Sequence, residues 1–247
     1  MIKSKDVIVS NIKIAENIYR MRLKPSKMSK MSAGQFVNIK VDGFSLRRPF
    51  GLCNIEKDCF DIIYRVQGEG TKKMSQLQRN DVVDVIKPLG SAFPIHEEQD
   101  EILIIGGGIG TPPLLELAKQ YRQCNKIVKV VLGFATEKDC ICEDDFKQLG
   151  CDVYMATMDG SYAYKGNVLD AVKAHHIDTQ FVYSCGSLAL LRSVSEHYEH
   201  GYISAEARMA CGIGACMGCV CKGKKDKEVY YRICKEGPVF KIGEVEL

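Results

Sequence analysis

Four cysteines near the end of the chain have a spacing that suits metal chemistry. Cys211, Cys216 and Cys219 form a C-x4-C-x2-C pattern, and Cys234 follows further along. This is the plant-type ligand pattern of a [2Fe–2S] cluster. Thiolates are soft ligands, and the glycines between them let the backbone curl around a cluster and direct N–H groups at its sulfurs. The spacing therefore predicts a one-electron centre held by these four cysteines.

A structural zinc site is the alternative for the same residues. Zinc sites usually contain paired C-x2-4-C knuckles, whereas only Cys216 and Cys219 make such a pair here. Cys221 could replace Cys219 as a ligand, but the x4/x2 spacing favours Cys219. The chain has 12 cysteines in all, and in a reducing cytosol metal binding or redox chemistry explains them better than disulfides.

A glycine-rich turn lies near the middle of the chain. It spans residues 106–110, after the apolar stretch 101–105 and before a helix expected over 111–123. Glycines permit close backbone approach, and a helix N-terminus presents free N–H groups to an anion. The glycines are spaced G-x-G-x-G, so the strict dinucleotide fingerprint is not met. The turn is either a phosphate loop of another family or simply a tight turn.

The N-terminal part holds a second group of residues with binding chemistry. Arg48 can fork onto a phosphate, and Phe50 or Tyr64 can flank a flat ring. Gly70 and Thr71 begin a short helix expected over 71–77, which is another anion site. Taken alone, these residues are better explained as surface charges and core aromatics.

Composition bounds the class of protein. The 247 residues are 46% hydrophobic and 26% charged, with a net charge of +3, which argues against a dedicated nucleic-acid binder. No apolar stretch reaches membrane-spanning length, and the start lacks the apolar core of a signal peptide. We expect a cytoplasmic protein that binds neither membrane nor nucleic acid.

Three regions differ in their patterning. Residues 2–95 contain short alternating segments that predict a small antiparallel β-barrel. Residues 101–200 alternate strands with helices, expected at 143–149, 167–175 and 188–197, and predict a parallel α/β domain. Residues 204–247 are too short to bury a core alone. We expect an α+β multidomain chain divided into 1–98, 99–203 and 204–247.

Electron counting connects the three regions. A nicotinamide exchanges two electrons as hydride, and an iron–sulfur cluster accepts one. A flavin handles both, so it is the natural converter between them. A barrel with a phosphate site, a nucleotide-type domain and a cluster loop therefore form a coherent electron path.

The combined pattern resembles the ferredoxin–NADP reductase superfamily. It is most similar to the electron-transfer subunits of class B dihydroorotate dehydrogenase, which are NAD-linked. The resemblance covers essentially the whole chain. It rests on Arg48-Pro49, Tyr64-Arg65-Val66, Gly68-Glu69-Gly70-Thr71, Gly106 to Gly110 with Pro112-Pro113-Leu114, Asp159-Gly160-Ser161, Cys185-Gly186-Ser187 and the four cysteines.

The resemblance implies a role for each matching residue. FAD is expected at Arg48, Pro49, Phe50, Gly51, Ile63, Tyr64, Arg65, Gly70 and Thr71. NAD is expected at Gly106, Gly107, Gly108, Gly110, Thr111, Asp159, Gly160 and Cys185. The resemblance also implies NAD over NADP, and the lack of an arginine cluster after residues 133–136 agrees with it.

Some of these positions allow a second interpretation or depart from the family. Cys185 is equally well explained as a buried thiol at a strand end. The chain has Gly51 where the superfamily usually has Ser or Thr, and Ser187 where Pro is common.

The resemblance also implies a partner. A catalytic subunit with FMN would oxidise dihydroorotate, in an assembly with two copies of each chain. Electrons would pass through the cluster and FAD to NAD+ in pyrimidine biosynthesis. We find no acid–base constellation and expect no catalytic residue for dihydroorotate in this chain.

Two alternatives stay open at the level of sequence. One is a related NAD(P)H reductase subunit serving ferredoxin, a hydrogenase or a sulfite reductase. The other is a zinc-stabilised interaction module on a degenerate reductase scaffold.

Overall fold

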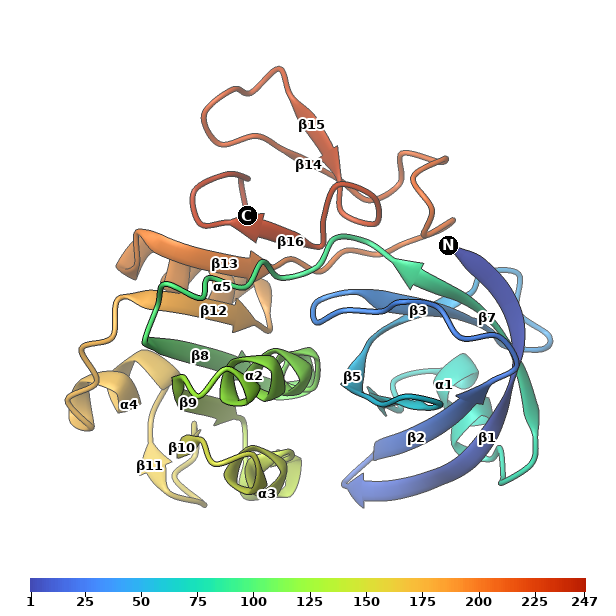
Figure 1. Ribbon diagram of the computed structural model, residues 1–247, viewed down its shortest axis with the longest axis horizontal. Coiled ribbons are helices and arrows are strands. Elements are labelled where there is room, and N and C mark those ends of the chain that lie inside the picture. The colour runs from blue at the N-terminus through green and yellow to red at the C-terminus, as the bar shows by residue number, and fades with distance from the viewer.

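The computed structural model describes residues 1–247, and its first part is a strongly curved antiparallel sheet (Figure 1). The strand order is β4-β3-β7-β1-β2-β6-β5, and every neighbouring pair is antiparallel. One helix, α1 (Glu69–Ser75), follows β6. The strands are β1 (Ile2–Ala15), β2 (Ile18–Pro25), β3 (Phe36–Lys40), β4 (Arg48–Gly51), β5 (Cys53–Ile55), β6 (Phe60–Arg65) and β7 (Val82–Leu89).

The barrel encloses an apolar core because its strands alternate inward and outward residues. The core includes Ile8, Leu23, Ile62 and Val85, all fully buried. Strand β2 shows the same alternation, because its buried apolar residues are separated by charged ones.

A charged pair also lies inside the barrel. Lys87 and Asp6 are both fully buried and form an ion pair. Such a pair is stable only because each charge compensates the other out of water.

The second part is a mainly parallel sheet flanked by helices. Its strand order is β11-β10-β9-β8-β12-β13-β16. The strands are β8 (Glu101–Gly107), β9 (Ile127–Phe134), β10 (Asp152–Thr157), β11 (Tyr164–Lys165), β12 (Phe181–Cys185), β13 (His200–Ser204) and β16 (Val239–Lys241). The order reverses between β8 and β12, and ligands of such sheets bind at this point, beyond the carboxyl ends of the strands.

The helices of this region agree with the sequence predictions to within a few residues. None of the helices combines the length and the apolar character that a membrane crossing requires. The helices are η1 (Gly108–Gly110), α2 (Pro113–Gln123), η2 (Glu137–Asp139), α3 (Glu143–Gln148), α4 (Val168–Ala174) and α5 (Leu188–His197).

The C-terminal residues lie across the top of both sheets in Figure 1. They form a small hairpin of β14 (Val220–Lys222) and β15 (Tyr230–Arg232). The following strand, β16, pairs antiparallel with β13 and so becomes an edge of the α/β sheet. The predicted fold class is confirmed, but this third region is not separate from the second.

Specific contacts hold the barrel against the α/β sheet. Arg20 of β2 pairs with Asp145 of α3 at 2.7 Å, and Arg65 of β6 pairs with Asp139 at 2.9 Å. The backbone N–H of Ile55 donates to the Glu116 carboxylate of α2 at 2.7 Å. These contacts fix the two faces that enclose the site described next.

Candidate cofactor and cluster site

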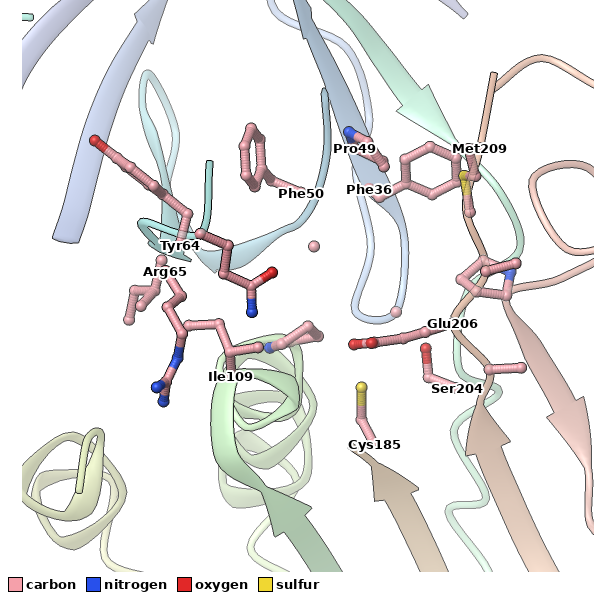
Figure 2. Close-up of a pocket in the computed structure, with 18 of the residues that line it drawn as sticks. Phe36, Pro49, Phe50, Tyr64, Arg65, Ile109, Cys185, Ser204, Glu206 and Met209 are labelled. Carbon is pink, nitrogen blue, oxygen red and sulfur yellow. The ribbon is translucent and has the colours of Figure 1, made fainter. Parts of the chain in front are cut away.

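A cavity of about 280 Å³ lies where the three regions meet. Figure 2 shows aromatic and apolar side chains of the barrel on one side and residues of the α/β sheet on the other. The cavity is lined by seven of the nine residues expected to hold FAD: Pro49, Phe50, Gly51, Ile63, Tyr64, Arg65 and Thr71. A site with aromatic walls and few polar groups suits a flat ring system.

The remaining two predicted FAD residues lie together beside the cavity. A Cβ atom on Gly70 would lie 3.0 Å from Arg48 Nε, so the guanidinium rests directly over the start of α1. Thr71 Oγ1 accepts the backbone N–H of Gln67 at 3.0 Å and shapes this turn. An arginine fork over free helix N–H groups suits a phosphate group. The residues present therefore fit a flavin nucleotide.

The packing around Gly51 explains why this chain has a glycine where the superfamily usually has Ser or Thr. A Cβ atom there would lie only 2.4 Å from Cγ of Pro113, the first residue of α2. The strand that carries the flavin residues thus touches the helix that follows the glycine turn. A serine side chain does not fit without displacing one of them.

The floor of the cavity consists of Cys185, Ser204 and Glu206, which Figure 2 shows below the barrel residues. Cys185 ends β12 and is 2% exposed. Burial raises the pKa of its thiol to about 12, with a smaller contribution from the Glu206 carboxylate. Removal from bulk water also raises the pKa of Glu206. Cys185 is therefore a neutral thiol, as in its simpler interpretation, but it also faces the cavity.

A second cavity, of about 740 Å³, adjoins the first at the reversal point of the sheet. Gly107, Gly108 and Gly110 line it, and Arg65 lines both cavities. A Cβ atom on Gly110 would lie 2.5 Å from Cα of Gly186, so the two turns approach too closely for side chains. Exposed backbone at the carboxyl ends of the strands fits a dinucleotide.

Five residues predicted for NAD do not line this cavity, and one of them, Cys185, lines the first cavity instead. Thr111 is fully buried, and a Cβ atom on Gly106 would lie 2.9 Å from its hydroxyl oxygen. Asp159 and Gly160 lie in the turn after β10, where Asp159 accepts the backbone N–H of Ser161 at 3.0 Å. Their contact with NAD stays a prediction.

Several lining residues were missed by the sequence analysis. Glu206, Met209 and Phe36 complete the first cavity, and Asp139 and Asn167 line the second. Asn167 has a recognisable signal, because its side chain caps α4 by accepting two backbone N–H groups. The others have no pattern in the sequence that distinguishes them from ordinary surface or core positions.

The four cysteines of the C-terminal pattern lie around one loop whose N–H groups point at their sulfurs. Cys211 Sγ accepts from Ala215 at 3.3 Å, Cys234 Sγ from Gly214 at 3.2 Å, and Cys219 Sγ from Cys234 at 3.4 Å. Burial alone would raise the pKa of Cys211, but the backbone donors and Cys216 outweigh it and lower the pKa to about 6. These donors favour the thiolate form of Cys211, whereas burial and the neighbouring Cys219 raise the pKa of Cys234 to about 12.

The thiols approach one another in two pairs. Cys216 helps to lower the pKa of Cys211, and Cys219 helps to raise the pKa of Cys234. No three His, Cys, Asp or Glu side chains converge as one metal ion requires. The paired arrangement fits two irons with two thiolates each, whereas zinc would draw four sulfurs to one point.

The fold and these sites define a flavin-dependent reductase that carries an iron–sulfur module. Among solved structures, an NADH-dependent reduced ferredoxin–NADP oxidoreductase aligns with a TM-score of 0.86 and 25% identity, over 98% of this chain and 89% of that one. A phthalate dioxygenase reductase, described as transferring electrons from pyridine nucleotides to [2Fe–2S], has a TM-score of 0.69 and 18% identity, over 99% and 98% of the two chains.

Sequence relatives give the family. Dihydroorotate dehydrogenase B (NAD(+)) electron transfer subunits of Bacillus mycoides and Bacillus cereus are each 42% identical over 100% of both chains. Residues 206–246 match the iron–sulfur cluster binding domain of dihydroorotate dehydrogenase B. The chain belongs to the family of dihydroorotate dehydrogenase B electron transfer subunits. This confirms the predicted flavin, iron–sulfur and NAD chemistry and selects it over the zinc module and the other reductase subunits.

Proposed function

We propose that this chain is the electron-transfer half of an NAD-linked dihydroorotate dehydrogenase that serves pyrimidine biosynthesis. The observation that carries the proposal is the full-length similarity to such subunits, at 42% identity. The geometry supports it, because the first cavity adjoins the nucleotide cavity and is also lined by Ala207 and Met209, which come just before the cysteine loop. When bound, the cluster supplies one-electron transfer, and FAD links it to the two-electron chemistry of NAD.

The residues proposed to hold each group follow from their positions. Arg48, Gly70 and Thr71 bind the FAD phosphates, and Phe50 orients the ring, with Tyr64 of the barrel core behind it. The other FAD contacts are Pro49, Gly51, Ile63 and Arg65. NAD is held at Gly107, Gly108 and Gly110, with Gly106, Thr111, Asp159, Gly160 and Cys185 in support. Cys211, Cys216, Cys219 and Cys234 bind the cluster.

A separate catalytic subunit completes the reaction. No residue of this chain is proposed to act on dihydroorotate, and the oxidation takes place on a partner that carries FMN. We propose an assembly with two copies of each chain, located in the cytoplasm. The 12 free cysteines suit that reducing compartment. We propose the three-part division into 1–98, 99–203 and 204–247 according to the three groups bound, with β16 of the last part completing the sheet of the second.

The partner is proposed to bind beside the cysteine loop. Ile213 is 40% exposed and Met217 is 53% exposed there, an apolar surface next to the exposed Cys216. Ile213→Asp should weaken association about tenfold, as loss of a central apolar contact does. Ile127→Asp is the matched control, because Ile127 is 48% exposed and lies on the far α/β sheet. Equal effects of both variants in a binding titration would contradict this surface.

A cysteine variant tests the whole proposal. Cys216→Ser should lose the cluster absorption but keep FAD, and with the catalytic subunit it should stop dihydroorotate-dependent reduction of NAD+. The spectrum, the iron content and NADH formation are measured on the same sample. Full NADH formation by this variant would refute the electron path, and a colourless wild-type protein containing zinc would refute the cofactor assignment.

A further inference from the structure

One barrel residue, Asn38 of β3, reaches the cysteine loop. Its side chain is 1% exposed, and its Nδ2 donates to the backbone carbonyl of Cys211 at 3.3 Å. The two residues are 173 positions apart in the chain. The contact therefore ties a cluster ligand directly to the strand next to the flavin residues, since Asn38 pairs with Pro49 of β4.

The alternation of β3 explains why this side chain faces the loop. Val37 and Ile39 point into the barrel core. Phe36 and Asn38 point to the opposite face, because successive side chains of a strand alternate. Phe36 lines the flavin-type cavity, where Figure 2 shows it beside Met209 of the C-terminal region. The same face of β3 thus presents Phe36 to the cavity and Asn38 to the cysteine loop.

The contact is tight on the side of the loop. A Cβ atom on Gly212 would lie 2.4 Å from Asn38 Nδ2, and Gly212 has φ +69°, which favours glycine. The backbone of the cysteine loop can pack against the side-chain amide of Asn38 only because Gly212 has no side chain.

The amide is poorly explained by barrel stability. Asn38 Oδ1 is buried and has no hydrogen-bond partner. A buried unpaired oxygen is unfavourable, and a leucine of similar size would avoid it. The property that leucine cannot supply is the hydrogen bond to Cys211.

We propose that Asn38 is a positioning residue for electron transfer between the cluster and the flavin. By fixing the Cys211 backbone on β3, it sets how the cluster faces the flavin cavity. The step is a one-electron transfer, in which the donor loses and the acceptor gains one electron and no bond forms or breaks. The inference rests on the proposed function.

The test is Asn38→Leu in the full chain loaded with FAD and cluster. Thermal stability should stay equal or rise, and reduction of the flavin by NADH should keep its rate. Amide hydrogen exchange over residues 211–216 should become about fivefold faster, because a neutral hydrogen bond changes local opening by about that factor. Cluster reduction after the flavin should slow, and the electron paramagnetic resonance spectrum of the reduced cluster should change.

Ser91→Ala is the matched control. Ser91 Oγ donates to Val239 O at 3.2 Å and accepts from Val239 N at 3.1 Å, so it also ties the C-terminal region but not a cysteine. It should leave the exchange of the loop and the resonance spectrum unchanged.

The outcomes separate the two proposals. The inference is overturned if Asn38→Leu has the amide exchange, the resonance spectrum and the rate of cluster reduction of the wild type. It is also overturned if Ser91→Ala slows cluster reduction by the same factor. If Asn38→Leu does not fold, Asn38→Ser, which also loses the reach to Cys211, decides by the same measurements. Absence of FAD or cluster from the wild-type chain is instead a failure of the proposed function.

Discussion

The contact between Gly51 and Pro113 offers a sharp test of how the two nucleotide regions are joined. In Gly51→Ser, the new Cβ lies 2.4 Å from Pro113 Cγ, whereas ordinary contact begins at 3.4 Å, so about 1.0 Å of separation must open (3.4 − 2.4). Overpacking of this kind costs about 1–3 kcal/mol. For a chain of this size, that lowers Tm by about 2–12 °C.

The displacement affects both sites, because β4 carries the flavin residues and α2 follows the glycine turn. We expect Gly51→Ser to release FAD during gel filtration and to bind NADH more weakly. Tm of the FAD-loaded protein and flavin fluorescence in the flow-through measure the two effects.

Two further variants make the test decisive. Pro113→Ala removes Cγ and leaves Cβ at 3.3 Å, so the double variant should recover most of the lost stability. Gly68→Ala is the control, since a Cβ atom there meets nothing within 4 Å. An unchanged Tm in Gly51→Ser, or a double variant no better than the single one, would refute the reasoning.

Three other predictions concern buried polar groups. Burial alone would raise the pKa of Asp84, but its ion pair with Arg47 at 2.6 Å helps to lower it below 3.8. The stability that this ion pair adds is fully present above pH 3.8, the ordinary pKa of an Asp side chain. It is lost as the pH falls through the lower pKa that Asp84 has in the folded protein. Asp84→Asn should therefore destabilise the protein at pH 7 but not near pH 2 in urea titrations; a constant difference would contradict this. Lys87→Met should cost about 3–5 kcal/mol, because it leaves the buried Asp6 side chain without its partner, and Asp6→Asn in addition should restore part of it in the same titrations. Tyr183→Phe should lower Tm by about 2–6 °C, because a buried hydroxyl that makes two hydrogen bonds of 2.7 Å is lost; an unchanged Tm would show that these bonds add nothing.

Much of the fold follows from local pattern. The strand at 101–107 contains the continuous apolar run 102–105, and the helix at 188–197 has one apolar stripe and begins after Ser187, which caps it. Periodicity and capping act over a few residues, so the sequence alone reveals them. The cysteine spacing works the same way, because the ligands lie in one loop.

Contacts between distant segments could not be predicted. Strand β16 has three residues and no detectable period, yet it joins the parallel sheet through β13. The hydrogen bond from Asn38 to Cys211 depends on the whole barrel and on the C-terminal region together. The place of Glu206 in the cavity likewise depends on three regions meeting, and nothing near it in sequence signals it.

The pairing of β16 with β13 has a consequence for how the protein is made. Until residues 239–241 leave the ribosome, β13 is an open edge with unpaired backbone groups, a state that favours aggregation. All four cysteines lie between β13 and β16 in the chain, so they leave the ribosome before this edge is closed. The sheet can therefore be closed only after the cysteine loop has been synthesised, because the strand that closes it follows the loop in the chain.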